Sequence, residues 1–273
     1  MSEEKAQALD EKFKDLNAII DVIDIAYDCG IRAFMLNTHH KAKDICEHIR
    51  QNSNKYLDIS FYPSMPYAHK YADAVAAKGI FGALKDTIMS DSSAGDIVGM
   101  LTKGGSLLFE KDMIKVMQLL IDIEMKIFRG LDVKVMFLQN IVTDLLLGFG
   151  VKEVFIEFAS YIKKKYGVEP GFVTMNMPRL VDFLLDCGIE NPVICSAINK
   201  AGYFMNPDQK TYEKTLQEGK FRPIAMSILA SGGVKPREAI EYVCRQPNLR
   251  SIVFGASSKQ HISETRALIE KHF

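Results

Sequence analysis

The chain has 273 residues, and its 34 lysine and arginine side chains balance 34 aspartate and glutamate side chains. This length allows one large hydrophobic core, and the zero net charge argues against nucleic acid or an anionic membrane as a partner. No stretch approaches the roughly 18 apolar residues of a membrane span, and the first residues lack the apolar region of a signal peptide. We therefore expect a soluble, cytoplasmic protein.

Short apolar segments rich in β-branched residues alternate with helical patterns along most of the chain. Strands are predicted at about 32–36, 57–62, 133–138, 172–175, 193–197, 222–229 and 250–254. Helices are predicted at about 15–29, up to 51, at 67–78, 111–128, 141–147, 152–166, 178–187 and 209–217, and from 236 and 259. This alternation predicts a parallel sheet with helical crossovers, and at this length a single (β/α)8 TIM-type barrel over residues 1–273. An eighth strand would come from 106–109, unless the first barrel strand has been replaced.

Residues 79–130 interrupt this rhythm and predict a helical insertion between the third and fourth barrel strands. Its last helix, about 111–128, is apolar on most faces and must be covered on several sides. One interpretation is a barrel helix packed under the insertion. The other is a lid, or a methionine-rich surface that binds a partner or a second copy of the chain.

The five cysteines are widely spaced, with no paired motif of a zinc site. We expect buried free thiols and no metal centre.

The last quarter of the chain holds two consecutive strand, turn and helix units with small residues in both turns. The first turn is Ala230-Ser231-Gly232-Gly233 and the second is Gly255-Ala256-Ser257-Ser258. In a barrel, such closing units can bind phosphate through backbone amides at a helix N-terminus.

These segments resemble a known family. Residues 225–233 (AMSILASGG) and 255–264 (GASSKQHISE) resemble the seventh- and eighth-strand motifs of the aldo/keto reductases, barrels that bind NADP(H) or NAD(H). Asn176 stands where that family has a serine-asparagine pair. The resemblance extends from about residue 152 to 273.

The resemblance implies a cofactor site for NADP or NAD. Asn176 and Ser196 would face the nicotinamide, residues 226–231 would line the pyrophosphate, and 255–258 with His261 and Glu264 would surround the adenosine. Met226 and Thr265 depart from the family pattern. The implied cofactor residues are Asn176, Ser196, Ser227, Ser231, Gly232, Gly233, Gly255, Ala256, Ser257, Ser258, His261 and Glu264.

The family's catalytic aspartate, tyrosine, lysine and histidine are not matched. Met35 and Phe137 are in register with the aspartate and the histidine, and Asn37-Thr38 and Gln139 fit only after a two-residue shift. A shift of two residues keeps the same face of a strand, but glutamine cannot transfer a proton. Altered or lost reductase chemistry is therefore expected.

Other polar side chains follow the predicted strands, where barrel enzymes carry out catalysis. They are His39, His40, Ser64, Tyr67, His69, Gln139, Asn140, Asn176, Asn199 and Lys200. We select His39, His40, Gln139 and Lys200 as catalytic candidates, because a rim histidine can move a proton and a desolvated lysine can form a Schiff base. The alternatives to an aldo/keto-reductase-like barrel that binds NAD(P)(H) or another phosphorylated ligand are a lyase or isomerase acting on a phosphorylated small molecule, and a non-catalytic barrel that binds a partner.

Overall fold

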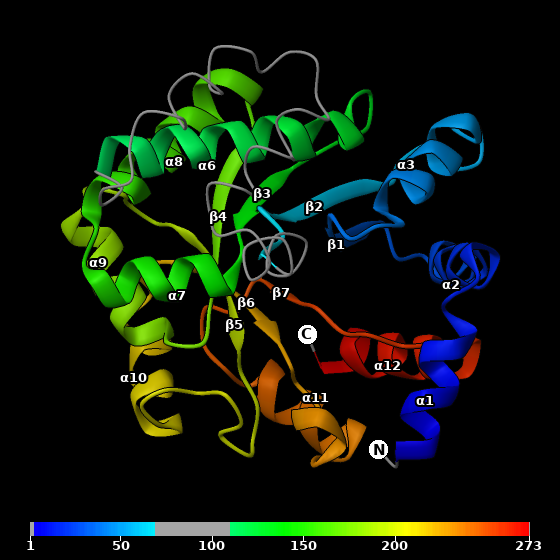
Figure 1. The fold of residues 1–273 in the computed structure, drawn as a ribbon. Coiled ribbons are helices and arrows are strands. Elements are labelled where there is room, and N and C mark those ends of the chain that lie inside the picture. The colour runs from blue at the N-terminus through cyan, green and yellow to red at the C-terminus, as the bar shows by residue number, and fades with distance from the viewer. Residues whose placement is uncertain (1–2, 69–109, 273) are drawn as a thin grey trace.

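A computed structural model describes residues 3–68 and 110–272. In this part of the chain seven strands pair in chain order into one parallel sheet, which curls inside a surrounding layer of helices (Figure 1). The strands are β1 (Ala33–Asn37), β2 (Ser60–Met65), β3 (Val135–Leu138), β4 (Glu169–Thr174), β5 (Val193–Ala197), β6 (Arg222–Met226) and β7 (Ser251–Ile252). The predicted parallel α/β fold is therefore confirmed.

The helices alternate with these strands, as expected for parallel crossovers. They are α1 (Glu3–Lys12), α2 (Leu16–Asp28), α3 (Ala42–Gln51), α6 (Glu110–Met125), η1 (Lys126–Phe128), α7 (Asn140–Phe149), α8 (Lys152–Tyr166), α9 (Met177–Asp186), α10 (Gln209–Glu218), η2 (Ala230–Gly232), α11 (Pro236–Cys244) and α12 (Lys259–His272). Within residues 3–68 and 110–272, none of them combines the length and hydropathy needed to cross a membrane.

Local signals in the sequence set several of these boundaries. Asp15 begins α2 by accepting a hydrogen bond from the backbone N–H of Asn17, and Asp208 begins α10 in the same way with Thr211. Gly30 follows α2 with a φ of +84°, a conformation that glycine adopts without strain.

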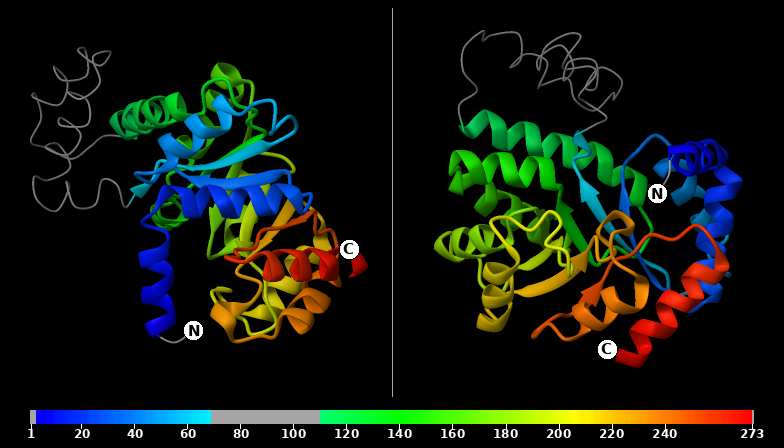
Figure 2. Two further views of the ribbon diagram at one scale, coloured as in Figure 1. Left: turned by 90° about the vertical axis from the view of Figure 1, so that its right-hand side faces the viewer. Right: turned by 90° about the horizontal axis from the view of Figure 1, so that it is seen from below.

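The sheet does not reproduce the full eight-stranded barrel that was expected. Within the described residues the order runs from β1 to β7, and no ladder joins these two edge strands. The segment 106–109, considered for an eighth strand, and residues 79–109 of the expected insertion lie outside the described residues. The rest of that insertion is α6 and η1, which lead into β3 (Figure 2).

Helix α6 is joined to α8 by a half-buried polar cluster. The carboxylate of Asp122 accepts hydrogen bonds from the hydroxyls of Tyr161 and Tyr166 and from the ammonium of Lys165, at 2.5 to 2.6 Å. Burial is the largest cause that raises the pKa of both tyrosine hydroxyls, and their bonds to Asp122 add to it. This face of α6 is therefore part of the helical layer.

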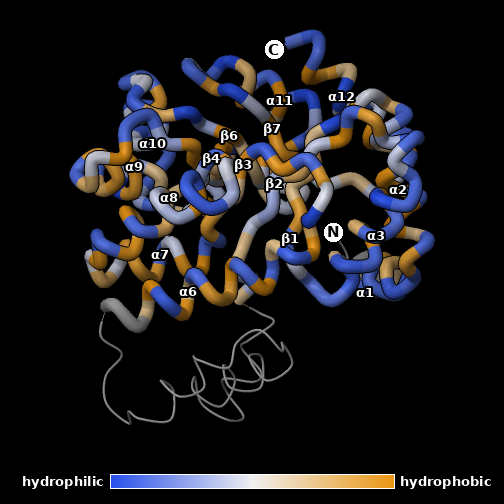
Figure 3. Tube along the Cα trace, turned by 90° about the horizontal axis from the view of Figure 1, so that it is seen from above, coloured by the Kyte–Doolittle hydropathy of each residue, from blue (hydrophilic) through white to orange (hydrophobic). Residues whose placement is uncertain are grey.

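The core has two layers, one on each side of the sheet. Inside the curl lie Phe137, Val173, Val193, Cys195 and Ile224. A larger apolar layer lies between the strands and the helices, and the surrounding helices alternate between hydrophobic and hydrophilic residues along the chain (Figure 3). The inner layer is closely packed at Gly171, because an added Cβ atom there would lie 2.6 Å from the ring of Phe137.

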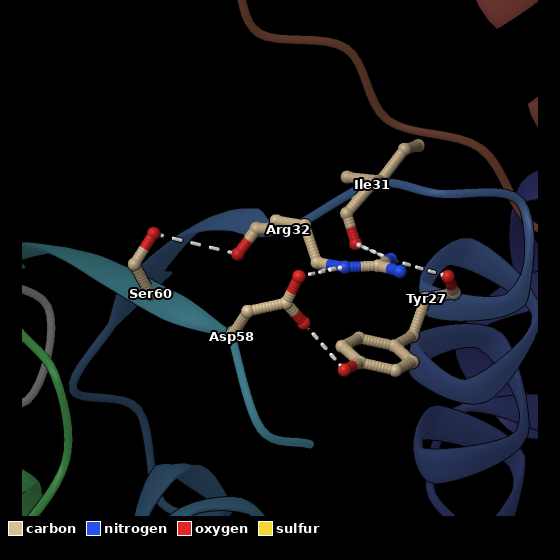
Figure 4. A network of polar contacts seen from close by, with 5 residues as sticks. All are labelled: Tyr27, Ile31, Arg32, Asp58 and Ser60. Atoms are coloured by element: carbon tan, nitrogen blue, oxygen red, sulfur yellow. Dashed lines mark hydrogen bonds and ion pairs between the residues drawn. The ribbon is translucent and has the colours of Figure 1, made fainter. Parts of the chain in front are cut away.

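A polar network joins the N-terminal ends of β1 and β2 to α2 (Figure 4). The Arg32 guanidinium lies over the ring of Tyr27, with its central carbon 3.9 Å from the ring centroid. It donates to Asp58 at 2.8 Å and to the carbonyl of Tyr27 at 2.6 Å, and the Tyr27 hydroxyl also donates to Asp58. The bonds from Tyr27 and Arg32 lower the pKa of the Asp58 carboxyl.

All five cysteines are free thiols, as predicted. Cys46 and Cys195 are buried, and burial raises the pKa of both thiols to about 12. Cys29, Cys187 and Cys244 are half-buried rather than buried.

Candidate functional site at the carboxyl ends of the strands

Asn176 follows β4 and begins α9. Its backbone N–H donates to the Thr174 hydroxyl at 2.9 Å, and that hydroxyl in turn donates to Asp144 on α7. The side-chain oxygen of Asn176 is buried and has no hydrogen-bond partner among the described residues. A buried unpaired acceptor costs free energy in the folded protein, so it is a position where a ligand donor would be stabilising.

Ser196, the other residue predicted to face a nicotinamide, has a different environment. It is fully buried, its hydroxyl donates to the carbonyl of Thr174 at 2.9 Å, and it lies 3.3 Å from the hydroxyl of Tyr212. Tyr212 belongs to α10, so the Ser196 side chain faces the helical layer. Ser196 is therefore connected, through the Tyr212 hydroxyl, to the backbone on either side of Asn176.

Tyr212 organises the backbone around Asn176. Its hydroxyl accepts from the N–H of Met177 at 3.1 Å and donates to the carbonyl of Met175 at 3.0 Å. Burial raises the pKa of this hydroxyl, so it stays protonated as a donor. The β4–α9 loop thus has a fixed conformation on both sides of Asn176.

The loop between β6 and α11 has an unusual backbone. Ser227, Ala230 and Ser231 have φ values of +54°, +48° and +54°, and Gly232 follows at +89°. Each such non-glycine residue costs about 1–3 kcal/mol and is often associated with a functional site. The backbone amides predicted to bind phosphate are only partly free in this loop. Those of Ala230, Gly232 and Gly233 already donate to carbonyls of the same loop.

The turn between β7 and α12 carries the other predicted phosphate residues. The Ser258 hydroxyl accepts from the N–H of His261 at 3.3 Å and so caps the first turn of α12. His261 and Glu264 are exposed, and Glu264 accepts from Gln260 at 2.8 Å. Ser257 is half-buried beside them. The turn therefore presents the start of a 14-residue helix with a histidine in its first turn.

A cavity of about 570 Å3 lies between the two edge strands β1 and β7, beside α2 and α12. Its walls are mainly apolar, including Phe34, Ile252 and Ile262, and Gly255 and Ala256 of the β7–α12 turn border it. The cavity occupies the part of the sheet where an eighth strand would close a barrel.

The larger cavity, about 1000 Å3, lies beyond the carboxyl ends of β1 and β2, between α3 and the α6–η1 segment. Its lining is Thr38, His39, His40, Lys43, Glu47, Arg50, Tyr67, Ile123, Lys126, Ile127 and Arg129. Four lysine and arginine side chains and one glutamate give it a net positive character.

His39 and His40 are thus in the same cavity, with ring centroids 5.8 Å apart. His39 is half-buried and His40 is exposed. Burial, followed by the charges of His40 and Lys41, lowers the pKa of His39, so its imidazole is neutral at pH 7. The Nδ1 atom accepts from the N–H of Lys41 at 3.2 Å. The remaining proton is therefore on Nε2, which can donate a hydrogen bond.

Glu124 is a polar residue beside this cavity that was not predicted from the sequence. This carboxylate on α6 is fully buried, accepts from the Thr38 hydroxyl at 2.5 Å, and also accepts from the N–H of Tyr67 at 3.1 Å. The sequence carried only a weak signal, a second acid two residues after Asp122 on a largely apolar helix, although a buried carboxylate requires partners.

The side chains of Gln139 and Lys200, both predicted to be catalytic, interact with other residues of the protein. The Gln139 side-chain oxygen accepts from the N–H of Ala68 at 2.7 Å, and the residue is 5% exposed. Lys200 forms an ion pair with Glu238 of α11, and both side chains are half exposed. An exposed ammonium with an anionic partner lacks the desolvation that a Schiff-base lysine requires. His69 lies outside the described residues.

Comparison with known proteins supports the fold. No family model matches this chain, and no curated protein matches it significantly. Two solved structures of candidate aldo-keto reductases from Pseudomonas aeruginosa are similar, each with a TM-score of 0.56 and 12% sequence identity over 94% of this chain. The matches cover 84% and 82% of those two chains. The chain therefore has an aldo-keto-reductase-like α/β fold.

Proposed function

We propose that this protein is an oxidoreductase-like barrel that binds NADP(H) or NAD(H) along the carboxyl ends of β4 to β7, with altered or lost reductase chemistry at β1 to β3. The observation that carries the proposal is the buried, unpaired side-chain oxygen of Asn176 in the β4–α9 loop. The aldo-keto-reductase-like fold and the resemblance of residues 225–233 and 255–264 to cofactor motifs support it.

The residues fit a dinucleotide at two positions. The Asn176 oxygen would accept from the carboxamide N–H of a nicotinamide, which would pair the buried acceptor. The turn 255–258 and the start of α12 would bind phosphate, because the free amides at a helix N-terminus attract anions. His261, exposed in the first turn, would add positive charge when protonated. The bound cofactor would supply hydride transfer, which no side chain can provide.

Among the described residues, His39 is the one best suited to act on a substrate oxygen. Its neutral imidazole, with the proton on Nε2, can donate a hydrogen bond to a carbonyl at pH 7. Tyr67 lines the same cavity. This pair would act in place of the family's missing tyrosine and lysine.

The test is a titration of the protein with NADPH and with NADH. The chain has ten tyrosines and no tryptophan, so energy transfer from tyrosine to the reduced nicotinamide gives a binding signal. We expect saturable binding of at least one cofactor, and binding that survives in His39→Asn. Absence of binding of both cofactors at high micromolar concentration would refute the proposal.

The basic cavity favours a second candidate function, a lyase or isomerase acting on a phosphorylated small molecule. Lys43, Arg50, Lys126 and Arg129 outnumber the single acid Glu47 in its lining. Arg50 also donates to the carbonyl of Arg129 at 3.1 Å, which keeps its charge beside the cavity. Inorganic phosphate and sugar phosphates would then raise the unfolding temperature of the wild type. Arg129→Gln would reduce this effect, and Arg245→Gln, in the lining of neither cavity, would not.

A further inference from the structure

The loop between β5 and α10, residues 198–208, holds one aromatic residue in a fixed position. Asn199 is fully buried, and both polar atoms of its side chain form hydrogen bonds with the backbone of Tyr203. The amide nitrogen donates to the carbonyl of Tyr203 at 2.8 Å, and the amide oxygen accepts from the N–H of Tyr203 at 2.9 Å. The backbone of Tyr203 is therefore rigid, although the residue lies in a surface loop.

This loop connects the two neighbouring loops that we assign to the cofactor. On one side the N–H of Asn206 donates to the carbonyl of Met175, the residue before Asn176, at 3.2 Å. On the other side the Ser231 hydroxyl donates to the hydroxyl of Tyr203 at 3.3 Å. Tyr203 thus lies between the β4–α9 loop and the β6–α11 loop, at the carboxyl ends of the strands.

The aromatic side chains in this loop are exposed. Tyr203 is 36% exposed and Phe204 is 50% exposed, and their ring centroids are 4.1 Å apart. Phe204 has a φ of +56°, which costs about 1–3 kcal/mol for a residue with a side chain. The protein therefore maintains a strained backbone that presents a packed aromatic pair to its surroundings. Such a surface is stabilised by a flat ligand that covers it.

We propose that Tyr203, supported by Phe204, forms a stacking surface for the nicotinamide ring of the cofactor. This inference rests on the proposed function. The unpaired oxygen of Asn176, in the loop that bonds to the Tyr203 loop through Met175 and Asn206, is what selects the nicotinamide over the adenine. The β5–α10 loop would then determine which face of the nicotinamide ring Tyr203 covers.

The experiment compares Tyr203→Leu with Phe149→Leu, which removes an aromatic ring that is 74% exposed on α7. Each variant is titrated with NADPH and with 2′-phospho-ADP-ribose, which lacks the nicotinamide. We expect Tyr203→Leu to weaken NADPH binding about tenfold, the upper end of an aromatic stacking contribution, and to leave binding of the fragment unchanged. Phe149→Leu should change neither. Urea unfolding of both variants checks that the fold is retained.

Tyr203→Trp provides a direct reporter, because it introduces the first tryptophan of the chain. Its fluorescence should be quenched saturably by NADPH, with wild-type affinity. Unchanged NADPH affinity in Tyr203→Leu, or equal loss for NADPH and the fragment, would overturn the stacking role and leave the proposed function intact. If the wild type bound neither NADPH nor NADH, both the stacking role and the proposed function would be overturned.

Discussion

Replacement of Asn176 by alanine should affect folding and binding in opposite directions. The side-chain oxygen is buried without a hydrogen-bond partner in the described part of the chain, and the side chain makes no capping bond to α9. Its removal therefore breaks no hydrogen bond of the free protein that the structure records. If the oxygen accepts from a cofactor, the same change removes a bond from the complex.

The magnitudes follow from these contacts. A buried unpaired polar group costs about 1–3 kcal/mol, so Asn176→Ala should keep the free energy of unfolding unchanged or raise it by up to about this amount. A single hydrogen bond contributes about 0.5–1.5 kcal/mol to binding, so the dissociation constant for NADPH should rise about 2- to 12-fold. Asn199→Ala is the matched control, because both ends of that amide are bonded to Tyr203. It should lower the free energy of unfolding.

Urea unfolding of the free protein gives the first quantity, and NADPH fluorescence titration gives the second. A loss of stability in Asn176→Ala comparable to that in Asn199→Ala would show that the oxygen has a structural partner. An unchanged dissociation constant would remove Asn176 from the cofactor site.

Three further predictions concern the fold and the cavity. Gly171→Ala should lower the free energy of unfolding by about 1–3 kcal/mol, because the new methyl group would overlap the ring of Phe137; Gly148→Ala, with open space on α7, should not destabilise. Tyr212→Phe should cost about 1–3 kcal/mol, since it leaves the N–H of Met177 and the carbonyl of Met175 unpaired, whereas Tyr27→Phe at the exposed Asp58 should cost less. Burial lowers the pKa of His39 below 6.5 in the folded state. The unfolded protein therefore takes up this proton at a higher pH than the folded protein does. The free energy of unfolding should decrease as the pH falls from 6.5 toward the folded pKa. His39→Asn should flatten the pH dependence of urea unfolding in that range, and an unchanged slope would contradict the buried neutral imidazole.

Most elements could be predicted from the alternation of strands and helices, and β5 (Val193–Ala197) has the predicted bounds. The errors have local causes. The predicted strand at 57–62 ends before Pro63, because proline removes a donor from a ladder, yet β2 continues through Pro63, which lies opposite Leu36. The strand β6 ends at Met226, earlier than predicted, because Ser227 adopts a φ of +54°.

The candidate site was less predictable because it depends on which face of a strand each side chain occupies. Both faces of a parallel sheet are buried, so the sequence does not distinguish the inner face from the helical one. Ser196 belongs to the helical face, where Tyr212 lies close to it. Glu124 and Thr38 are 86 residues apart in the chain, and Tyr203 meets Ser231 only in the folded loops. No local pattern identifies such partners.

The most direct test of the cofactor site is backbone hydrogen exchange measured with and without saturating NADPH. We expect slower exchange at residues 175–177, 227–234 and 255–262, where the loops after β4, β6 and β7 lie. Slower exchange confined to residues 38–50 and 123–129 would instead assign the ligand to the basic cavity, and would contradict the proposed cofactor site.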